Sequence, residues 1–517
     1  MTGTAASQTP PAPPSSAVRP GPLGPLLGPP PPPGPFGRAL SAFRWDGRGA
    51  APLPVLALVA GVGVAVAVMV VGHQPGLGVA LGGLVAWAAA VPALVRRRSL
   101  VDAALAVLSV LLVGVVAVRD APWVVALCVL TAAWAATAAL TGARATPAVV
   151  AAPLSWLAGV VRALPWLRHG AGDAVGARRQ QVLRVGRAVA LAAVVVVVFG
   201  ALFASADRVF ASLLPRFDLG VLPGQVVVAL LVAVAVATNA QLAAHPPGWS
   251  ALRPGPGRPA GVVEWAIPVV ALDLVVFAFV TVQATALAGG HRHVLETAGL
   301  TYAQYARQGF AQLVVATALT LVVVAVAARH APRGTGRERV VVRAGLGVLC
   351  VGTLGVVTSA LLRMDLYVDA FGLTRLRLWV ALAEAAMGVV LVLVLVAGVR
   401  WRAGWLPTAV LGVVGATVLV LAAVDPDAQI VRHNTGADLD VPLDVRYLQG
   451  LSADAVPAVD ALDEPLRSCV LDGMSLREAE SGFGWNLGRA RAASVVDERA
   501  VPTSWPPASC DGVDVRW

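Results

Sequence analysis

Long apolar runs separated by short polar stretches make up most of the chain from residue 52 onward. A helix needs about 20 predominantly apolar residues to cross a bilayer. Eleven runs come close enough to that length to be predicted as spans: 52–72, 77–95, 101–118, 122–141, 188–205, 221–243, 262–288, 309–328, 344–362, 379–399 and 405–424. A further apolar stretch, 147–167, is the one whose placement the pattern leaves open.

The composition supports lipid as the solvent of this chain. Hydrophobic residues make up 57% of it and charged residues 13%, and the mean hydropathy is +0.76. A soluble domain could not keep that much apolar surface away from water. The predicted fold class is an all-α integral membrane protein, with about eleven transmembrane helices and a small, mostly helical extracytoplasmic C-terminal domain.

Three regions follow from the same pattern. Residues 1–50 are rich in Pro, Gly and Ser, cannot bury a core, and are predicted to form a disordered cytoplasmic tail, with a PxxP ligand as the alternative. Residues 51–424 form the polytopic transmembrane domain, and residues 425–517 form the extracytoplasmic C-terminal domain.

Arginine distribution predicts the orientation. With eleven spans and a cytoplasmic N-terminus, Arg96–Arg98, Arg144–Arg187, Arg329–Arg343, and Arg400 with Arg402 all fall inside, as the positive-inside bias requires. A span at 147–167 would break that pattern. We therefore predict an amphipathic helix on the inner surface there, with its lipid-facing residues being Trp156, Val160, Leu164 and Leu167.

Because all 39 basic residues are arginine, a GC-rich bacterial genome is indicated, and the expected location is a bacterial plasma membrane. An odd number of spans places the C-terminus outside. The C-terminal region carries sixteen acids and eight arginines, a balance of −8 against +18 for the rest, so the net charge of +10 does not indicate nucleic-acid binding. Its two cysteines, Cys469 and Cys510, lie on the oxidising side and are predicted to form a disulfide.

The stretch GLTYAQYARQGF, residues 299–310, interrupts the apolar runs. Thr301 followed by Gln304 fits a capping box, so a helix is predicted to begin outside the membrane and continue into the eighth span. Tyr302 and Tyr305 lie on a face that a second helix could approach. The alternative is an interfacial anchor, with the tyrosines at headgroup level and Arg307 on phosphate.

A second polar stretch, RMDLYVDAFGLTRLRLW, covers residues 363–379. Asp365 and Asp369 are one helical turn apart, as are Arg363 and Tyr367. We predict that Gly372 ends this helix and that Thr374 caps the next one, which Arg375 and Arg377 then enter, with Glu384 two turns further in. Two carboxylates can serve acid–base catalysis, but beside arginines they more often form ion pairs.

Asp273, near the middle of the seventh span, is costly in lipid unless it is protonated, paired or beside a polar cavity. It indicates a proton or ligand site, with an interhelical hydrogen bond as the structural alternative. His291 and His293 with Glu296 resemble a metal cluster only loosely, and we predict no metal site and no cofactor. No phosphate-cradling or nucleophile-elbow motif is present.

The segments EWAIPVVALDLVVFAFVTVQ, GLTYAQYARQGFAQL, RMDLYVDAFGLTRLRLW and WNLGRARA resemble an actinobacterial family of polytopic membrane proteins, the domain of unknown function type 4173, related to type 4153. The resemblance runs from the first spans to the outer domain, and it implies the same architecture without adding a reaction. The motif positions that it implies are Asp273, Gln283, Tyr302, Tyr305, Arg307, Gly309, Phe310, Arg363, Tyr367, Gly372 and Arg377.

These features lead to one functional hypothesis with alternatives. The chain is expected to be a non-enzymatic transport or sensing protein with an outward-facing polar site for an anionic small molecule or lipid head group. Asp365 and Asp369 would hold the arginines in the absence of ligand. The expected ligand-binding residues are Asp273, Gln283, Tyr302, Tyr305, Arg307, Arg363, Asp365, Tyr367, Asp369 and Arg377. The alternatives are a membrane-embedded enzyme acting on an envelope lipid or glycan, with Asp365 or Asp369 as base, and an envelope scaffold whose outer domain binds a partner protein.

Overall fold

A computed structural model of the chain describes residues 49–206, 220–252, 260–288, 310–437, 439 and 441–498, with a few isolated positions between 34 and 43. Side chains of part of the segment 175–204 lie outside this description. Every regular element in the described ranges is a helix. Within these described ranges, ten helices are long and apolar enough to cross a membrane, which confirms an all-α, multi-pass membrane protein.

Most of the predicted spans correspond to one helix each. These are α2 (Leu53–Val70), α5 (Leu100–Gly114) with the 3-10 turn η1 (Val115–Ala117), α6 (Pro122–Thr141), α9 (Leu222–Ala244), α10 (Val262–Ala288), α13 (Phe310–His330), α14 (Gly336–Phe371), α15 (Arg375–Arg400) and α16 (Leu406–Ala423). Helix α10 has the predicted boundaries, whereas α14 begins eight residues before and ends nine residues after its predicted span, because a helix can continue past the lipid.

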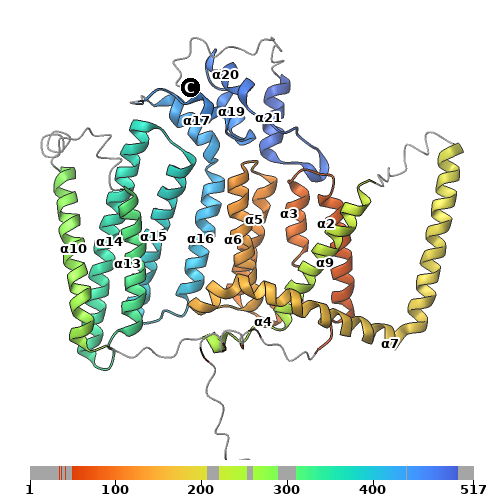
Figure 1. Ribbon diagram of the computed structural model, residues 1–517, viewed down its shortest axis with the longest axis horizontal. Coiled ribbons are helices and arrows are strands. Elements are labelled where there is room, and N and C mark those ends of the chain that lie inside the picture. Colours follow the sequence, from red (N-terminus) through yellow and green to blue (C-terminus); the bar gives the residue numbers. More distant parts are fainter. Residues whose placement is uncertain are drawn as a thin grey trace, which may run out of the picture.

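Two packed groups make up the bundle (Figure 1). In one group α14 contacts α10, α13 and α15, and in the other α5 packs on α6 and α2 packs on α9. Helix α16 contacts α15, α6 and α5 and so connects the two groups. Glycines set the close approach of α10 to α14, since a Cβ at Gly352 would lie 2.8 Å from a Val276 methyl and one at Gly355 would lie 3.1 Å from Val280.

The expected single span over 77–95 is divided. Helix α3 (Leu77–Val85) ends well short of the predicted boundary, and α4 (Val91–Arg97) begins after a run of turns. Pro92 lies in the first turn of α4, where its missing N–H costs nothing, whereas inside a continuous helix it would remove a hydrogen bond and clash with the preceding turn. Neither piece alone is long enough to span, so the count of eleven stays a prediction.

A single helix of 61 residues, α7 (Thr146–Ala206), contains both the predicted surface helix and the predicted fifth span. Figure 1 shows its first part running across the ends of the bundle helices and its last part turning up at the side. The stretch Thr146–Ala174 is nevertheless long and apolar enough to count among the ten candidate spans.

The lipid-facing stripe of α7 differs from the prediction. Of the four predicted residues only Leu164 belongs to it, while Trp156 and Leu167 pack against the bundle. The exposed apolar stripe is Leu154, Leu157, Val161 and Leu164. The expected register was wrong because Trp166, which the predicted stripe did not include, is buried in the apolar cluster that α7 forms with α2 and α9, so its face of the helix points inward.

The two ends of the bundle differ in character, and we name them by what they carry (Figure 1). At the arginine end lie the end of α4, the start of α7, the connection from α13 to α14 and the end of α15. These connections hold the arginine groups Arg96–Arg98, Arg144, Arg329–Arg343 and Arg400 with Arg402. At the opposite end, the domain end, lie the described residues that follow α16, from α17 to α21.

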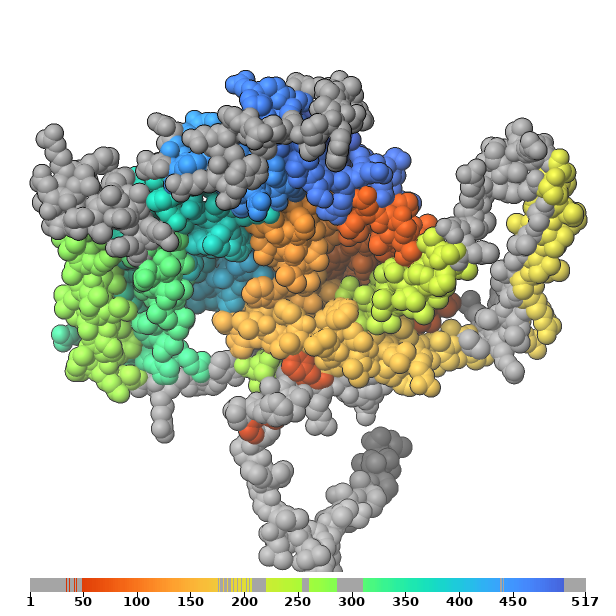
Figure 2. Space-filling model, turned by 45° about the horizontal axis from the view of Figure 1, so that its top comes forward, coloured from red at the N-terminus to blue at the C-terminus, as the bar shows by residue number. Residues whose placement is uncertain are grey.

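The C-terminal domain is a layer of short helices on the domain end (Figure 1), and its atoms are blue in Figure 2. Its elements are α17 (Pro426–Gly436), α18 (Val445–Gln449), η3 (Ala453–Ala455), α19 (Val456–Val459), α20 (Leu466–Gly473), η4 (Gly482–Gly484) and α21 (Leu487–Glu498). The layer has its own apolar core, in which Ile430, Leu448 and Val470 are fully buried. Cys469 is buried in that core, and Cys510 lies outside the described residues, so their pairing stays a prediction.

Candidate functional site

Part of the predicted ligand site lies outside the described residues. The segment 289–309 contains Tyr302, Tyr305 and Arg307, and also the His291, His293 and Glu296 group. Among the residues that the structure does describe, no group of three or more His, Cys, Asp or Glu side chains could hold a metal ion. The remaining members of the predicted site, on α10, α14 and α15, can be located.

Arg363 and Gln283 meet across the contact between α14 and α10. The Arg363 Nη2 donates to the Gln283 Oε1 over 2.8 Å, and Gln283 is buried. Gln283 belongs to the stripe of α10 that packs on α14, whose other buried members are Trp265, Val269, Asp273 and Val276. Their spacing of three, four and seven residues is that of one helix face, which is why Asp273 and Gln283 both point into the bundle.

Asp273 is separate from this contact. It lies ten residues before Gln283 on the same helix, about 15 Å lower at 1.5 Å per residue. Its side chain is buried, and its Oδ1 has no hydrogen-bond partner in the described part of the chain. The structure therefore does not bring Asp273 together with Arg363 or Arg377, and the residue stays a candidate site of its own.

Tyr367 and Arg377 meet where α14 ends and α15 begins. The guanidinium carbon of Arg377 lies 4.1 Å from the centre of the Tyr367 ring, and its Nη1 donates to the carbonyl oxygens of Phe371, over 2.8 Å, and of Gly372. A cation over the face of an aromatic ring is attracted by its quadrupole. Tyr367 is one turn beyond Arg363 on α14, and Arg377, which covers its ring, comes from the first turn of α15.

The turn between α14 and α15 is built as the sequence predicts. Gly372 follows α14 at a φ of +78°, a conformation that favours glycine, and Thr374 caps α15 by accepting from the Arg377 N–H over 3.3 Å. Asn434 of the C-terminal domain holds the turn with two hydrogen bonds. Its Oδ1 accepts from the Leu373 N–H over 2.6 Å, and its Nδ2 donates to the Leu373 carbonyl oxygen over 3.0 Å.

Asp365 and Asp369 do not pair with the described arginines of the predicted site. Both are exposed, and neither forms an ion pair with a described residue. The arginine of this region that does pair with a carboxylate is Arg375, whose Nε and Nη2 bind the two oxygens of Asp427 at 2.9 and 2.7 Å. Asp427 comes from α17, so the carboxylate that pairs here belongs to the C-terminal domain and is neither Asp365 nor Asp369.

Glu384 and Thr317 form a second buried polar contact. Glu384, on α15, is fully buried, and its Oε1 accepts from the Thr317 hydroxyl on α13 over 2.8 Å. Its Oε2 has no partner among the described residues. A carboxyl group in this position joins two helices of the group around α14 in the way expected of intramembrane polar residues.

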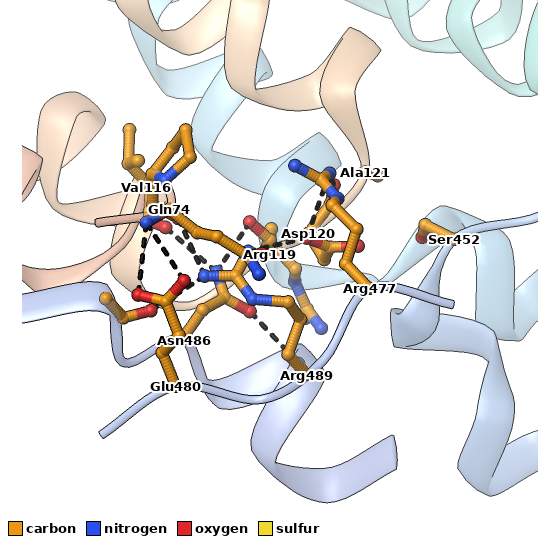
Figure 3. Close-up of polar contacts among 12 residues, drawn as sticks. Gln74, Val116, Arg119, Asp120, Ala121, Ser452, Arg477, Glu480, Asn486 and Arg489 are labelled. Carbon is orange, nitrogen blue, oxygen red and sulfur yellow. Dashed lines mark hydrogen bonds and ion pairs between the residues drawn. The ribbon is translucent and has the colours of Figure 1, made fainter. Parts of the chain in front are cut away.

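The junction between the C-terminal domain and the bundle was missed by the sequence analysis (Figure 3). Arg489 of α21 donates to the Asp120 Oδ1 over 2.8 Å, and Arg477 approaches the same oxygen at 3.1 Å. Asn486 donates to the Val116 and Arg119 carbonyls, at 2.9 and 3.0 Å. The only sequence signals were Asp120, a charged residue in the short connection between two apolar runs, and Arg489 within the segment WNLGRARA.

Asp454 and Glu480 extend the junction. The Asp454 Oδ2 accepts from the backbone N–H groups of Asp120 and Ala121 at 2.8 and 2.9 Å, and the Glu480 carboxylate accepts from the Gln74 N–H. Burial raises the pKa of Asp454 to about 6, although these backbone hydrogen bonds oppose the shift. The segment 71–76 between α2 and α3, and the α5–α6 connection, are thereby both fastened to the C-terminal domain.

The α14–α15 turn contacts the C-terminal domain through Asp427, whose pKa shifts in the opposite direction to that of Asp454. Burial by itself would raise the pKa of Asp427, but the hydrogen bonds and charge of Arg375 outweigh it and hold that pKa below its ordinary value. Asp425, in the short connection between α16 and α17, pairs with Arg119 of the α5–α6 connection. Three connections at the domain end therefore contact the C-terminal domain through charged side chains.

A family model for a domain of unknown function, DUF4153, matches residues 106–462. The chain belongs to the DUF4153 family. The matched region runs from α5 into the C-terminal domain, so it contains Asp120, Asp427 and the α14–α15 turn of this DUF4153 protein but not Arg489. No curated protein and no solved structure matches the chain.

Proposed function

We propose that this DUF4153 protein is a non-enzymatic ligand-binding protein, serving transport or sensing, whose polar site opens at the domain end. The site is formed by the ends of α10, α14 and α15, and its ligand is an anionic small molecule or a lipid head group. Residues Tyr302, Tyr305 and Arg307 are proposed to complete it from the segment before α13.

The observation that carries the proposal is the environment of Arg377. Its hydrogen-bond acceptors among the described residues are two backbone carbonyls, and a neutral ring covers the guanidinium. No carboxylate of the described chain pairs with it. The N-terminus of α15, a 26-residue helix, adds positive potential at the same place. A guanidinium in such surroundings suits a planar or phosphate-bearing anion.

The C-terminal domain supports a sensing role. Its Asn434 is hydrogen-bonded to the Leu373 backbone of the α14–α15 turn, and its Asp427 pairs with Arg375, two residues before Arg377. A ligand that moves Arg377 would therefore act on the turn to which the domain is fastened. The surface of this domain is the part proposed to bind an envelope protein partner.

The location in the cell is also a proposal. We place the arginine end on the cytoplasmic side of a bacterial plasma membrane, with the N-terminus inside and the C-terminal domain outside. The gathering of the arginine groups at one end supports this orientation. The arginine-only basic composition and the motifs support an actinobacterial source and a closer relationship to type 4173.

Binding of inorganic pyrophosphate by the full-length protein in phosphatidylcholine nanodiscs tests the proposal. Pyrophosphate should raise the melting temperature of the wild-type protein in a concentration-dependent way, because a ligand that binds only the native state stabilises it. Arg377→Gln should weaken the apparent affinity at least tenfold. Arg400→Gln, a change at the arginine end of the same helix, is the matched control and should leave the affinity unchanged.

Arg377→Lys separates lost charge from lost packing. Lysine keeps the positive charge over Tyr367 but lacks the fork, so it should retain part of the affinity that the glutamine variant loses. Equal affinity in the wild type and in Arg377→Gln, or no response of the wild type to pyrophosphate, would contradict the proposal.

A further inference from the structure

A cavity lies between α13, α14 and α15 toward the arginine end, remote from the proposed ligand site. Its volume is about 230 Å³. Its inner walls are apolar side chains from all three helices: Val324, Leu346, Cys350, Val394 and Leu395. An apolar cavity of roughly 150 Å³ is already large enough to hold a benzene-sized molecule. The space therefore suits a hydrocarbon group.

The mouth of this cavity is cationic and aromatic. Arg333 and Arg343 place their guanidinium carbons 5.3 and 5.4 Å from the centre of the Trp401 ring. The same three residues also line an adjoining hollow of about 570 Å³, which Arg339 borders as well. Arginines beside a tryptophan are the side chains expected where hydrocarbon gives way to phosphate head groups.

Trp401 is held in an uncommon backbone conformation. It follows the last residue of α15 at a φ of +52°, in the left-handed region that a bulky side chain rarely adopts. Such a conformation costs free energy and persists only where surrounding contacts determine it. Here the Trp401 N–H donates to the Ala397 carbonyl oxygen, and two guanidinium groups lie against the ring.

The positive charge at the mouth is not neutralised by the described chain. Arg333, Arg339 and Arg343 form no ion pair with a described carboxylate. The acid closest in sequence, Glu338, is engaged in a capping box, since its Oε2 accepts from the Thr335 N–H over 3.0 Å. An anion at the mouth would therefore relieve the repulsion among these arginines.

We propose that this cavity is a binding site for an anionic phospholipid of the leaflet at the arginine end. One acyl chain enters the apolar cavity between α13, α14 and α15, and the phosphate lies in the adjoining hollow. Arg333 and Arg343 bind the phosphate oxygens, and Trp401 covers the glycerol region. This site is distinct from the ligand site proposed at the domain end, because it lies at the opposite end of α14 and α15.

Gly347 offers a way to block the cavity without changing charge. It lines the cavity, and a Cβ added there would have no heavy atom within 4 Å. Leucine at this position should fill the space, and it favours a helix more than glycine does. Gly61→Leu is the matched control, since Gly61 lies in α2 and also faces open space.

The experiment measures lipid binding by the full-length protein. The protein is reconstituted in phosphatidylcholine nanodiscs with increasing phosphatidylglycerol, and retained lipid is counted by native mass spectrometry after gentle detergent release. Wild type and Gly61→Leu should retain phosphatidylglycerol in preference to phosphatidylcholine. Gly347→Leu and the double variant Arg333→Gln/Arg343→Gln should each reduce that retention at least tenfold, whereas Arg400→Gln/Arg402→Gln should not.

A competition arm separates the lipid from its head group. Free glycerol 1-phosphate should displace bound phosphatidylglycerol at most weakly, because it lacks the acyl chain. Full displacement by glycerol 1-phosphate, equal retention of both lipids by the wild type, or unchanged retention in Gly347→Leu would each overturn the proposal. Melting temperatures of all variants without added phosphatidylglycerol establish that each is folded.

Discussion

Arg489 and Asp120 form an ion pair of 2.8 Å whose side chains are only 1% and 6% exposed, although 369 residues separate them in the chain. The Arg489 Nη2 also donates to the carbonyl oxygens of Pro75 and Gly484, at 2.9 and 2.8 Å. One guanidinium thus joins the α2–α3 segment, the α5–α6 connection and the C-terminal domain. The bundle and this domain are held together by specific polar contacts as well as by apolar packing.

Replacing Arg489 by alanine should destabilise the docked domain severely. The change leaves the Asp120 carboxylate buried with only Arg477 as a partner, and removing one member of a buried pair typically costs about 3–5 kcal/mol. Limited proteolysis of the folded protein should then cut the C-terminal domain faster. Arg491→Ala, an exposed arginine on the same helix, is the control and should behave as wild type. Equal proteolysis rates for the two variants would show that the pair is dispensable.

Asp454 should make the docked domain less stable as the pH rises. Its pKa in the folded chain, about 6, lies above the ordinary 3.8, so between these values the folded state keeps a proton that the unfolded state has lost. Stability should therefore fall as the pH rises from about 4 to about 6, by about 3 kcal/mol for two pKa units, and should not change further above pH 6 through this group. Thermal unfolding as a function of pH measures the slope.

Asp454→Asn is the variant that isolates this contribution. The asparagine carbonyl can accept from the Asp120 and Ala121 N–H groups but does not titrate over this range. The slope between pH 4 and 6 should become shallower than in the wild type. Burial also raises the pKa of Asp425, which contributes a slope of the same sign, so the comparison is the difference between the two proteins. Superimposable pH profiles would refute the assignment to Asp454.

Thr317→Val should destabilise the bundle, because it leaves both oxygens of the buried Glu384 carboxyl group without a described hydrogen-bond donor. The expected cost is about 1–3 kcal/mol, measured by thermal unfolding in detergent. Replacing both partners, in Thr317→Val/Glu384→Leu, should recover most of the loss, since no polar group is then left unsatisfied. Thr358→Val, an exposed hydroxyl bonded to its own helix, is the control. A double variant as unstable as the sum of its single changes would contradict this account.

The proposed orientation predicts the result of topology reporters. Alkaline phosphatase, which folds only outside the cytoplasm, should be active when fused after Trp517 and inactive when inserted between Arg329 and Arg343. The reason is that the arginine groups are retained on the cytoplasmic side during insertion. A cytoplasmic reporter at the same two sites serves as the control and should show the opposite activities. The reverse pattern would invert the orientation.

The predicted Cys469–Cys510 disulfide should make the C-terminal domain resistant to alkylation. A bridge that closes a loop of about 40 residues contributes roughly 3–4 kcal/mol in the chain-entropy model. Mass spectrometry of unreduced, denatured protein treated with iodoacetamide should find Cys128 and Cys350, the free thiols of the bundle, alkylated and the other two cysteines unmodified. Alkylation of Cys469 and Cys510 without prior reduction would exclude the bridge.

Local physical chemistry allowed much of this fold to be predicted from the sequence. Spanning helices follow from the length of apolar runs, and the end of α14 at Gly372 and the cap of α15 at Thr374 follow from conformational and hydrogen-bonding preferences of single residues. The burial of Asp273 and Gln283 was also foreseeable, because their spacing from Val276 puts all three on one helix face. Such features depend on neighbours within a few positions.

Tertiary structure alone decided which polar groups became partners. Arg375 follows Asp369 closely in the chain, yet it binds Asp427, 52 residues away, because folding of the C-terminal domain brings that carboxylate against the turn. Which face of α7 points inward likewise depended on tertiary packing, because Trp166 is buried in the cluster that α7 forms with α2 and α9. Apolar periodicity determines that a helix forms and which residues can face inward. Which charge meets which depends on how helices distant in sequence pack, and no local pattern contains that information.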